Sequence, residues 1–346
     1  MSLTPGSAEI DHAASLLRAG RVVALPTETV YGLGANALDA EAVARIYAVK
    51  RRPPTSPMIV HVSSVEMAKS LVAFWPVKAD LLAGKFWPGP LTMVLTKIVL
   101  NKMVLNKDGA TPPVPADPAS TFAASPRIPD IVTAGLATVG LRMPAHPVAL
   151  ALIRAAGVPL AAPSANRFTE LSPTTAEHVR QSLGADVDYV LDGGPCEVGI
   201  ESTVVSLAAD PPVLLRPGGV SRAELEALLG PIASAGAPSA GAHPSPGMHQ
   251  RHYSPRTPVR LVRDGKLPET GRGIYLQRTA PARRAGVMTV QMPLLAPDYA
   301  AALYRQLHQA DDLGCDWIAV ELPPAGPEWE AVHDRLSRAA SSEKTS

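Results

Sequence analysis

The sequence predicts an α/β protein made of two domains. First, short apolar runs alternate with longer amphipathic stretches along the chain, which is typical of strands that alternate with helices. Second, a length of 346 residues favours two domains over one. Third, residues 231–248 are rich in Pro, Ala, Gly and Ser, a composition that cannot bury enough apolar surface to form a core. This stretch therefore indicates a linker between the two parts.

The first elements are a helix and a buried strand. The helix is expected over residues 8–19, where Gly20 stops it, and the strand over residues 22–25. Pro26 ends the strand because proline cannot donate to a sheet ladder. Residues 27–36 contain hydroxyls, a carboxylate, a phenol and two glycines, and are expected to form a polar turn whose glycines allow positive φ or close approach to a ligand.

A helix and a second strand complete this unit. The helix opens at Asp39 and ends in the basic run 50–52, and the strand over residues 58–62 carries His61. A glycine-bearing loop and three cations between two strand ends favour an anion site, although cations also prefer helix C-termini without any ligand. The glycines lack the GKS or GKT of a P-loop and the third glycine of the dinucleotide motif.

The same patterns predict the remaining elements. Further helices of the larger domain are expected over residues 65–72, 74–86, 146–156, 176–183 and 222–229. Further strands are expected over residues 91–96, 137–142, 158–162, 189–191, 201–205 and up to 216. In the smaller domain, strands are expected over residues 259–262, 273–276, 286–290 and 317–321, with helices over 299–313 and 328–340. Their alternation predicts a small, mainly parallel sheet.

The composition excludes several classes of protein. A formal net charge of +1 gives no basic excess of the kind that constitutive nucleic-acid binders carry. Cys196 and Cys315 are far apart and have no CxxC spacing, so we expect neither a disulfide framework nor a zinc site, and a reducing cytoplasm fits. There is no signal-peptide pattern and no apolar run of about 20 residues. We therefore expect a cytoplasmic protein with no membrane partner.

The run PTETVYGLG, followed by KxRP and PMIVHV, resembles the N-terminal signature of the YrdC/Sua5 family, the threonylcarbamoyl-AMP synthases. WPGPLT and later segments extend the resemblance over most of the chain. It implies a YrdC-like catalytic domain over residues 1–230, with a twisted mixed sheet and flanking helices. It also implies a smaller, Rossmann-like Sua5-type domain over residues 256–346. Residues 231–255 would be a flexible linker that folds back toward the active site. The insertion at 97–127 is either a tolerated surface loop or a lid over the nucleotide.

The resemblance also implies a reaction. L-threonine, bicarbonate and ATP would give threonylcarbamoyl-AMP and pyrophosphate, for the t6A modification at tRNA position 37. Because a carbamate anion must approach the α-phosphate of another anion, the site needs cations, hydroxyls and backbone N–H groups. Mg²⁺ is expected to bind through the ATP phosphates, with no protein metal site. The expected partners are a downstream threonylcarbamoyl transferase complex and, through a weak contact, tRNA.

Site residues are carried over one by one, and we expect them at strand ends, where open α/β sheets place ligands. Lys50 and Arg52 match the KxR pair and are the expected catalytic residues, in contact with the phosphates. The other expected nucleotide contacts are Ser56, Thr138, Ala162, Ser164, Asn166, Ser172, Arg216 and Tyr253. The expected L-threonine contacts are Thr29, His61, Arg142 and Ser202, with Arg142 pairing with the amino-acid carboxylate.

Several of these residues also have a plainer interpretation. Ser172 suits a helix cap, His61 suits a satisfied core histidine, and Glu201 suits a structural ion pair. Tyr253 belongs to an HYxP segment that, by resemblance, closes over the nucleotide and excludes water from a labile mixed anhydride. The alternative is that this segment simply begins the second domain. His249 and His252 lack further ligands nearby, which argues against a metal site.

Two other functions stay open at this point. One is a different carbamoyl-adenylate-forming enzyme, such as a hydrogenase-maturation module, which would not need a threonine pocket. Such proteins usually carry zinc-type fingers, and two cysteines do not supply them. The other is a non-catalytic RNA-binding module, against which the balanced charge and the KxR and SxN pairs argue.

Overall fold

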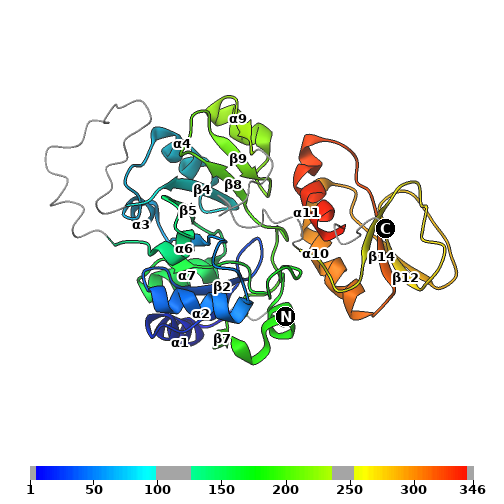
Figure 1. Ribbon diagram of the computed structural model, residues 1–346, viewed down its shortest axis with the longest axis horizontal. Coiled ribbons are helices and arrows are strands. Elements are labelled where there is room, and N and C mark those ends of the chain that lie inside the picture. Colours follow the sequence, from blue (N-terminus) through cyan, green and yellow to red (C-terminus); the bar gives the residue numbers. More distant parts are fainter. Residues whose placement is uncertain (1–4, 99–125, 236–252, 341–346) are drawn as a thin grey trace.

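The computed structural model describes residues 5–98, 126–235 and 253–340. Most of the insertion expected at 97–127, residues 236–252 of the expected linker, and His249 and His252 lie outside these residues. The described chain forms two α/β lobes, with the N-terminal lobe on the left of Figure 1 and the C-terminal lobe on the right. Within these residues, no helix combines the length and the hydrophobicity that crossing a membrane requires.

The first lobe is built on a mixed sheet of ten strands in the order β10-β9-β8-β4-β5-β3-β6-β2-β1-β7. The strands are β1 Val23–Leu25, β2 Gly32–Asn36, β3 Ile59–His61, β4 Leu91–Thr96, β5 Thr138–Arg142, β6 Leu160–Ala161, β7 Tyr189–Val190, β8 Thr203–Ser206, β9 Val213–Arg216 and β10 Ala233–Ser234. At its centre β3 runs parallel to β5 and antiparallel to β6. The expected twisted mixed sheet with flanking helices is confirmed in its mixed α/β character.

The helices of this lobe match most of the predicted positions, but α3 ends at Lys69 instead of residue 72 and α4 begins at Val77 instead of residue 74. They are α1 Ser7–Arg18, α2 Ala40–Lys50, α3 Val65–Lys69, α4 Val77–Phe86, α6 Asp130–Thr133, α7 Pro147–Ala156, α8 Ala176–Leu183 and α9 Arg222–Leu229, with a 3₁₀ turn η1 Gly184–Asp186. The Asp39 side chain accepts hydrogen bonds from two backbone N–H groups of the first turn of α2. The short helix α6 was not predicted.

The expectation of a polar turn over residues 27–36 is wrong for its second half. Residues 32–36 form β2, which pairs antiparallel with β1. Leu33 and Ala35 are fully buried in the core, so this strand is held by burial. Neither glycine has positive φ; a Cβ on Gly34 would lie 2.8 Å from a Leu25 methyl carbon, and one on Gly32 would lie 3.2 Å from the Ala162 Cβ. These glycines permit close packing of neighbouring chain segments.

The second lobe carries a four-stranded sheet in the order β11-β14-β12-β13, and every strand pair in it is parallel, as predicted. The strands are β11 Val259–Val262, β12 Gly273–Gln277, β13 Val287–Gln291 and β14 Trp317–Glu321. The helices are α10 Ala296–Asp312 and α11 Glu330–Ala340, preceded by the 3₁₀ turn η2 Pro327–Trp329. The first two residues of the predicted helix 328–340 belong to that turn.

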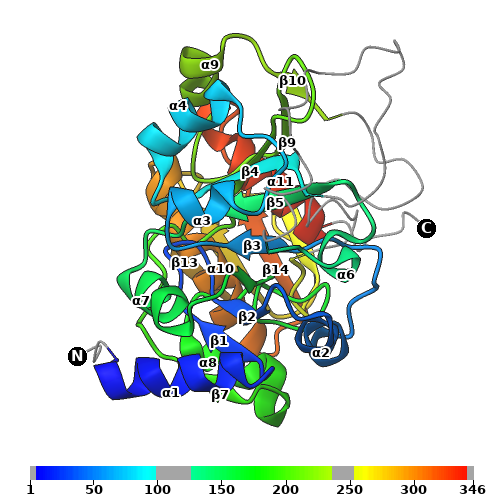
Figure 2. The ribbon, with the colours of Figure 1, turned by 90° about the vertical axis from the view of Figure 1, so that its left-hand side faces the viewer.

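The two lobes share a hydrophobic cluster. Val30, Leu171 and Ile200 of the first lobe are buried together with Tyr299 and Leu303 of α10. Figure 1 shows α10 and α11 on the side of the second lobe that faces the first. In Figure 2, viewed from the side of the first lobe, β3 lies in front of α10 and β14. The second lobe therefore covers the sheet of the first near its centre.

Candidate active site

A cavity with an empty volume of about 530 Å³ lies over the central strands of the first lobe. It is lined by Thr27, Thr29, Val30, Gly32, Arg52, Ile59, His61, Arg142, Ala162, Pro163, Ser164, Glu201, Ser202, Arg216 and Tyr253. Ile59 and His61 are two residues apart on β3 and therefore point to the same face of the sheet. The cavity thus extends across a face of the sheet and is not confined to the strand ends, where the sequence placed it.

The structure brings most of the predicted site residues to this one cavity. All four predicted threonine contacts line it, namely Thr29, His61, Arg142 and Ser202. So do the predicted nucleotide residues Arg52, Ala162, Ser164, Arg216 and Tyr253. These residues come from separate segments of the chain, and the sheet register accounts for part of the convergence: His61 of β3 is the direct partner of Arg142 of β5.

Arg142 is held by its own carboxylate partner. Its Nη2 lies 2.6 Å from Glu28 Oε1, and its Nη1 donates to the Thr29 hydroxyl at 2.9 Å. The other Glu28 oxygen accepts from the backbone N–H of Ala145 at 3.0 Å. Glu28 and Arg142 are both buried. A buried guanidinium with a fixed counter-ion is oriented in advance for an anionic ligand.

The other two arginines are also buried and hydrogen-bonded. Arg52 donates to the Pro57 carbonyl at 3.0 Å, and burial lowers the pKa of Arg52 to about 10, so the side chain stays protonated at neutral pH. Arg216 donates to the backbone carbonyl of Ser202 at 2.9 Å and to its hydroxyl at 3.1 Å. Three cations around one cavity favour a ligand with several negative charges.

His61 lines the cavity in its neutral form. It is 3% exposed, and burial together with the charge of Arg142 lowers its pKa to about 3. Among the residues that the structure describes, its Nδ1 has no hydrogen-bond partner. It is therefore not the fully satisfied core histidine that was the plainer interpretation, because a buried polar nitrogen without a partner is costly.

Five predicted nucleotide residues do not line this cavity. Lys50 lies beneath the loop that carries Ser164: its Nζ donates to the Ser164 carbonyl at 2.5 Å and to the Asn166 carbonyl. Burial, and then the charge of Arg52, lowers the pKa of Lys50 well below its ordinary value. The Asn166 side-chain amide donates to the carbonyls of Arg167 and Glu170. Lys50 and Asn166 thus stabilise the conformation of this loop without lining the cavity.

The other three lie close by in different settings. Ser56 is buried, and its carbonyl accepts the Tyr47 hydroxyl at 2.9 Å. Thr138 lines a second, smaller cavity that shares Ile59 with the first. Ser172 donates its hydroxyl to Glu201 at 2.6 Å, and the cap of α8 is Thr175, so the capping interpretation of Ser172 is wrong.

Among the described residues that line the cavity, Glu201 is the only one with a carboxylate side chain. It pairs with Arg335 of α11 at 2.7 Å, which confirms its interpretation as an ion-pair partner. Sequence reasoning missed Arg335, because a single arginine in an amphipathic helix gives no sign of a partner more than a hundred residues away.

The cavity residues do not suit a metal held by the protein. In the described part of the chain, no group of three or more His, Cys, Asp or Glu residues is placed to hold a metal ion. The nearest carboxylates, Glu28 and Glu201, are each paired with an arginine. A Mg²⁺ ion here would depend on oxygen ligands brought by a phosphate-containing substrate.

Comparison with known protein families identifies the family to which the chain belongs. A family model named Sua5_yciO_yrdC and described as "Telomere recombination" matches residues 15–112 and 117–218. A second model, the C-terminal domain of threonylcarbamoyl-AMP synthase, matches residues 220–341. The chain belongs to the Sua5/YciO/YrdC family. The second match places it among the members that carry the additional Sua5 C-terminal domain.

Several relatives match the chain over almost its full length. The threonylcarbamoyl-AMP synthase of Bacillus subtilis is 40% identical over 98% of this chain and 94% of its own length. The threonylcarbamoyl-AMP synthase of Pyrococcus abyssi is 43% identical over 95% of this chain and 93% of its own length. The crystal structure of Pyrococcus abyssi Sua5 complexed with L-threonine superposes with a TM-score of 0.82 at 36% identity, covering 96% of this chain and 94% of that one.

Proposed function

We propose that this member of the Sua5 family is an L-threonylcarbamoyladenylate synthase, an adenylyl-transferring enzyme that converts L-threonine, bicarbonate and ATP into threonylcarbamoyl-AMP and pyrophosphate. The observation that carries the proposal is the convergence of Arg52, Arg142 and Arg216 with the neutral His61 on one buried cavity. Such a site suits two anionic reactants that must be brought together. The names of its full-length relatives and the threonine complex of the Pyrococcus protein support it.

The threonine end of the site is Thr29, His61, Arg142 and Ser202. The α-carboxylate pairs with Arg142, which Glu28 holds in place at 2.6 Å. His61 offers an uncharged ring nitrogen without another partner, so it contacts a polar group of threonine without adding charge.

The nucleotide end comprises Arg52, Ala162, Ser164, Arg216 and Tyr253 around the cavity, with Lys50, Ser56, Thr138, Asn166 and Ser172 close by. The threonine nitrogen first bonds to the carbon of bicarbonate, with loss of water, and forms a carbamate. A carbamate oxygen then attacks the α-phosphorus of ATP, and pyrophosphate leaves as the α–β bridging bond breaks. Of the two residues expected to be catalytic, Arg52 lines the cavity and neutralises phosphate charge, whereas Lys50 is a positioning residue that holds the Ser164 loop in place.

Tyr253 closes this end of the site. It lines the cavity and is fully buried between the two lobes. Its burial excludes water from a product that water would hydrolyse. The expected linker from residue 231 begins too early, because β10 at Ala233–Ser234 pairs with β9 in the first sheet. In this proposal residues 1–230 together with β10 form the catalytic domain, the rest of residues 231–255 forms the connection that carries Tyr253, and residues 256–346 form the domain that packs behind it. Mg²⁺ would be held by the ATP phosphates and would balance part of their charge. The product passes to a cytoplasmic threonylcarbamoyl transferase complex for tRNA modification. This protein itself makes at most a weak contact with tRNA.

The test is pyrophosphate release from ATP and Mg²⁺, measured with and without L-threonine and bicarbonate, with L-serine as the matched control. Release that requires both threonine and bicarbonate is expected. Release without threonine would point instead to another carbamoyl- or acyl-adenylate enzyme. No release, together with salt-dependent tRNA binding, would overturn the proposal in favour of an RNA-binding module.

A further inference from the structure

The C-terminal lobe places a charged side chain against the wall of the cavity. Arg335 of α11 is 1% exposed, and its Nε donates to Glu201 Oε2 at 2.7 Å. Its Nη2 donates to the Pro217 carbonyl at 3.1 Å, and its guanidinium lies 5.2 Å from the centre of the Tyr253 ring. Its Nη1 also lies 2.5 Å from Asp334 Oδ2, and Asp334 in turn pairs with Arg338, so Arg338 balances Asp334 while Arg335 balances Glu201. Arg335 therefore joins the second lobe to the cavity wall through several directed contacts.

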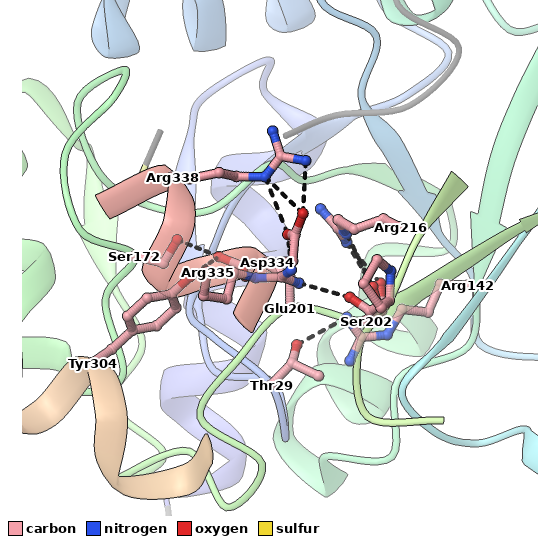
Figure 3. A network of polar contacts seen from close by, with 11 residues as sticks. Thr29, Arg142, Ser172, Glu201, Ser202, Arg216, Tyr304, Asp334, Arg335 and Arg338 are labelled. Carbon is pink, nitrogen blue, oxygen red and sulfur yellow. Dashed lines mark hydrogen bonds and ion pairs between the residues drawn. The ribbon is translucent and has the colours of Figure 1, made fainter. Parts of the chain in front are cut away.

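Glu201 is surrounded by groups from both lobes. Ser172 of the first lobe donates to Oε1 at 2.6 Å, and Tyr304 of α10 donates to Oε2 at 3.1 Å. Figure 3 shows Ser172 and Tyr304 on one side of this carboxylate and Ser202 and Arg216 on the other. Glu201 thus separates the interface of the lobes from the anion-binding part of the cavity.

The charge of Glu201 conflicts with the proposed ligand. Burial raises the pKa of Glu201, but Arg335 and Arg216, with the hydrogen bonds from Ser172 and Arg335, outweigh burial and leave it below its ordinary value. The carboxylate is therefore ionised at neutral pH. An ionised carboxylate in the lining of a site for ATP repels the phosphates and draws on the charge of Arg216 unless another cation balances it.

An ion pair at this place is not needed for packing alone. Replacing a buried ion pair by apolar residues of similar volume is often neutral or stabilising, whereas removing one partner leaves an uncompensated charge. The consequence of the arrangement is electrostatic: the cation that balances Glu201 comes from the second lobe, whereas the groups that would contact phosphate come from the first lobe and from Tyr253.

We propose that Arg335 is a positioning residue for the nucleotide site: by pairing with Glu201, the docked α11 helix neutralises the cavity wall and leaves Arg216 to the phosphates of ATP. The identity of the anion rests on the proposed function. The C-terminal lobe then contributes to substrate binding through a charge, in addition to covering the cavity.

The test is a charge cycle on this pair. The equilibrium dissociation constant of an ATP analogue with a methylene group between the α- and β-phosphorus is measured for wild type, Arg335→Met, Glu201→Gln and the double variant. Arg335→Met is expected to weaken binding about tenfold or more, because the carboxylate is then unbalanced. Glu201→Gln added to Arg335→Met is expected to restore binding to within about threefold of wild type.

Two controls separate charge from structure. Arg256→Met removes an exposed arginine of the second lobe that pairs with Asp311, outside the Glu201 network, and it is expected to leave analogue binding unchanged. Uncharged adenosine is expected to bind all folded variants alike. Thermal melting identifies any variant that fails to fold, and Arg335→Gln, which also removes the charge, then replaces Arg335→Met. Arg335→Lys, which keeps the charge, is expected to bind the analogue nearly as well as wild type.

The opposite result is equally clear. If the double variant binds the analogue as poorly as Arg335→Met alone, Arg335 acts only as structure and the proposal is wrong. Because this assay measures binding without turnover, it is independent of pyrophosphate release. If wild type releases no pyrophosphate in response to threonine, but the four variants bind the analogue as expected, the proposed reaction is wrong and the role of Arg335 still holds.

Discussion

Replacing Lys50 by Met should damage both the fold and the reaction, by amounts that the structure allows us to work out. Lys50 is buried and donates to the carbonyls of Ser164 and Asn166. A hydrogen bond to a charged group contributes about 1.5–3 kcal/mol, and two are lost. Methionine also removes the cost of burying an ammonium, which is the main reason for the lowered pKa of Lys50. The two hydrogen bonds together amount to about 3–6 kcal/mol, and the relieved burial cost offsets part of this, so we expect a net loss of about 2 kcal/mol in unfolding free energy.

The loss of activity should exceed the loss of stability. Ser164 lines the cavity, and the misplacement of a positioning group by about 1 Å can cost about a hundredfold in rate. Pyrophosphate release by folded Lys50→Met is expected to fall by about that factor, measured at 25 °C beside urea unfolding of the same preparations. Arg51→Met, which changes the exposed neighbour, is the matched control and should leave both quantities unchanged.

Two outcomes would refute this reasoning. Wild-type turnover in folded Lys50→Met would show that Lys50 does not position the Ser164 loop for the reaction. A loss of turnover with unchanged unfolding free energy would mean that the two carbonyl contacts do not brace the loop, and that Lys50 acts directly on the nucleotide through its charge.

Three further predictions concern the cavity wall. Arg52→Met should abolish pyrophosphate release while the protein stays folded, and wild-type release in this variant would contradict the phosphate role of Arg52. Tyr253→Ala should weaken binding of the methylene ATP analogue and increase hydrolysis of the adenylate, whereas Tyr253→Phe should keep both near wild type; equal behaviour of the two variants would argue against closure by the ring. His61 has a folded pKa of about 3, below its unfolded value near 6.5, so the unfolded chain binds more protons between these values. Unfolding free energy should therefore fall as the pH drops below 6.5, with a His61 contribution of about 1.4 kcal/mol per pH unit that urea titrations should find missing in His61→Gln.

The sequence was sufficient for elements whose pattern is local. The strands β4 and β11 and the helix α8 lie at their predicted positions, because burial or an N-cap such as Thr175 marks both their type and their ends. The sequence pattern gave the wrong prediction for β2, because its glycines, which make room for neighbouring side chains, are also typical of a turn. The requirement for small residues there comes from Leu25 and Ala162, which the strand meets only in the folded protein.

In the candidate site, too, the sequence predicted what local motifs carry and missed what depends on the fold. Local motifs, interpreted through the family resemblance, indicated Arg52, His61 and Arg142, and the cavity contains all three. The motifs could not tell which groups contact a ligand and which support the ones that do. Lys50 is in the KxR motif yet donates to backbone carbonyls, because the course of the loop that carries Ser164 places those acceptors over its ammonium.

The ion pair between Arg335 and Glu201 shows why sequence motifs alone could not predict the charge of the site. Glu201 belongs to the first lobe, and its ionised state in the cavity wall depends on a cation that folds with the second. The electrostatic character of the site is thus a property of the assembled pair of lobes. Replacing Arg335 leaves every cavity residue unchanged but should still alter the binding of phosphate, and the effect should depend on the charge of Glu201 more than on the volume of the side chain introduced.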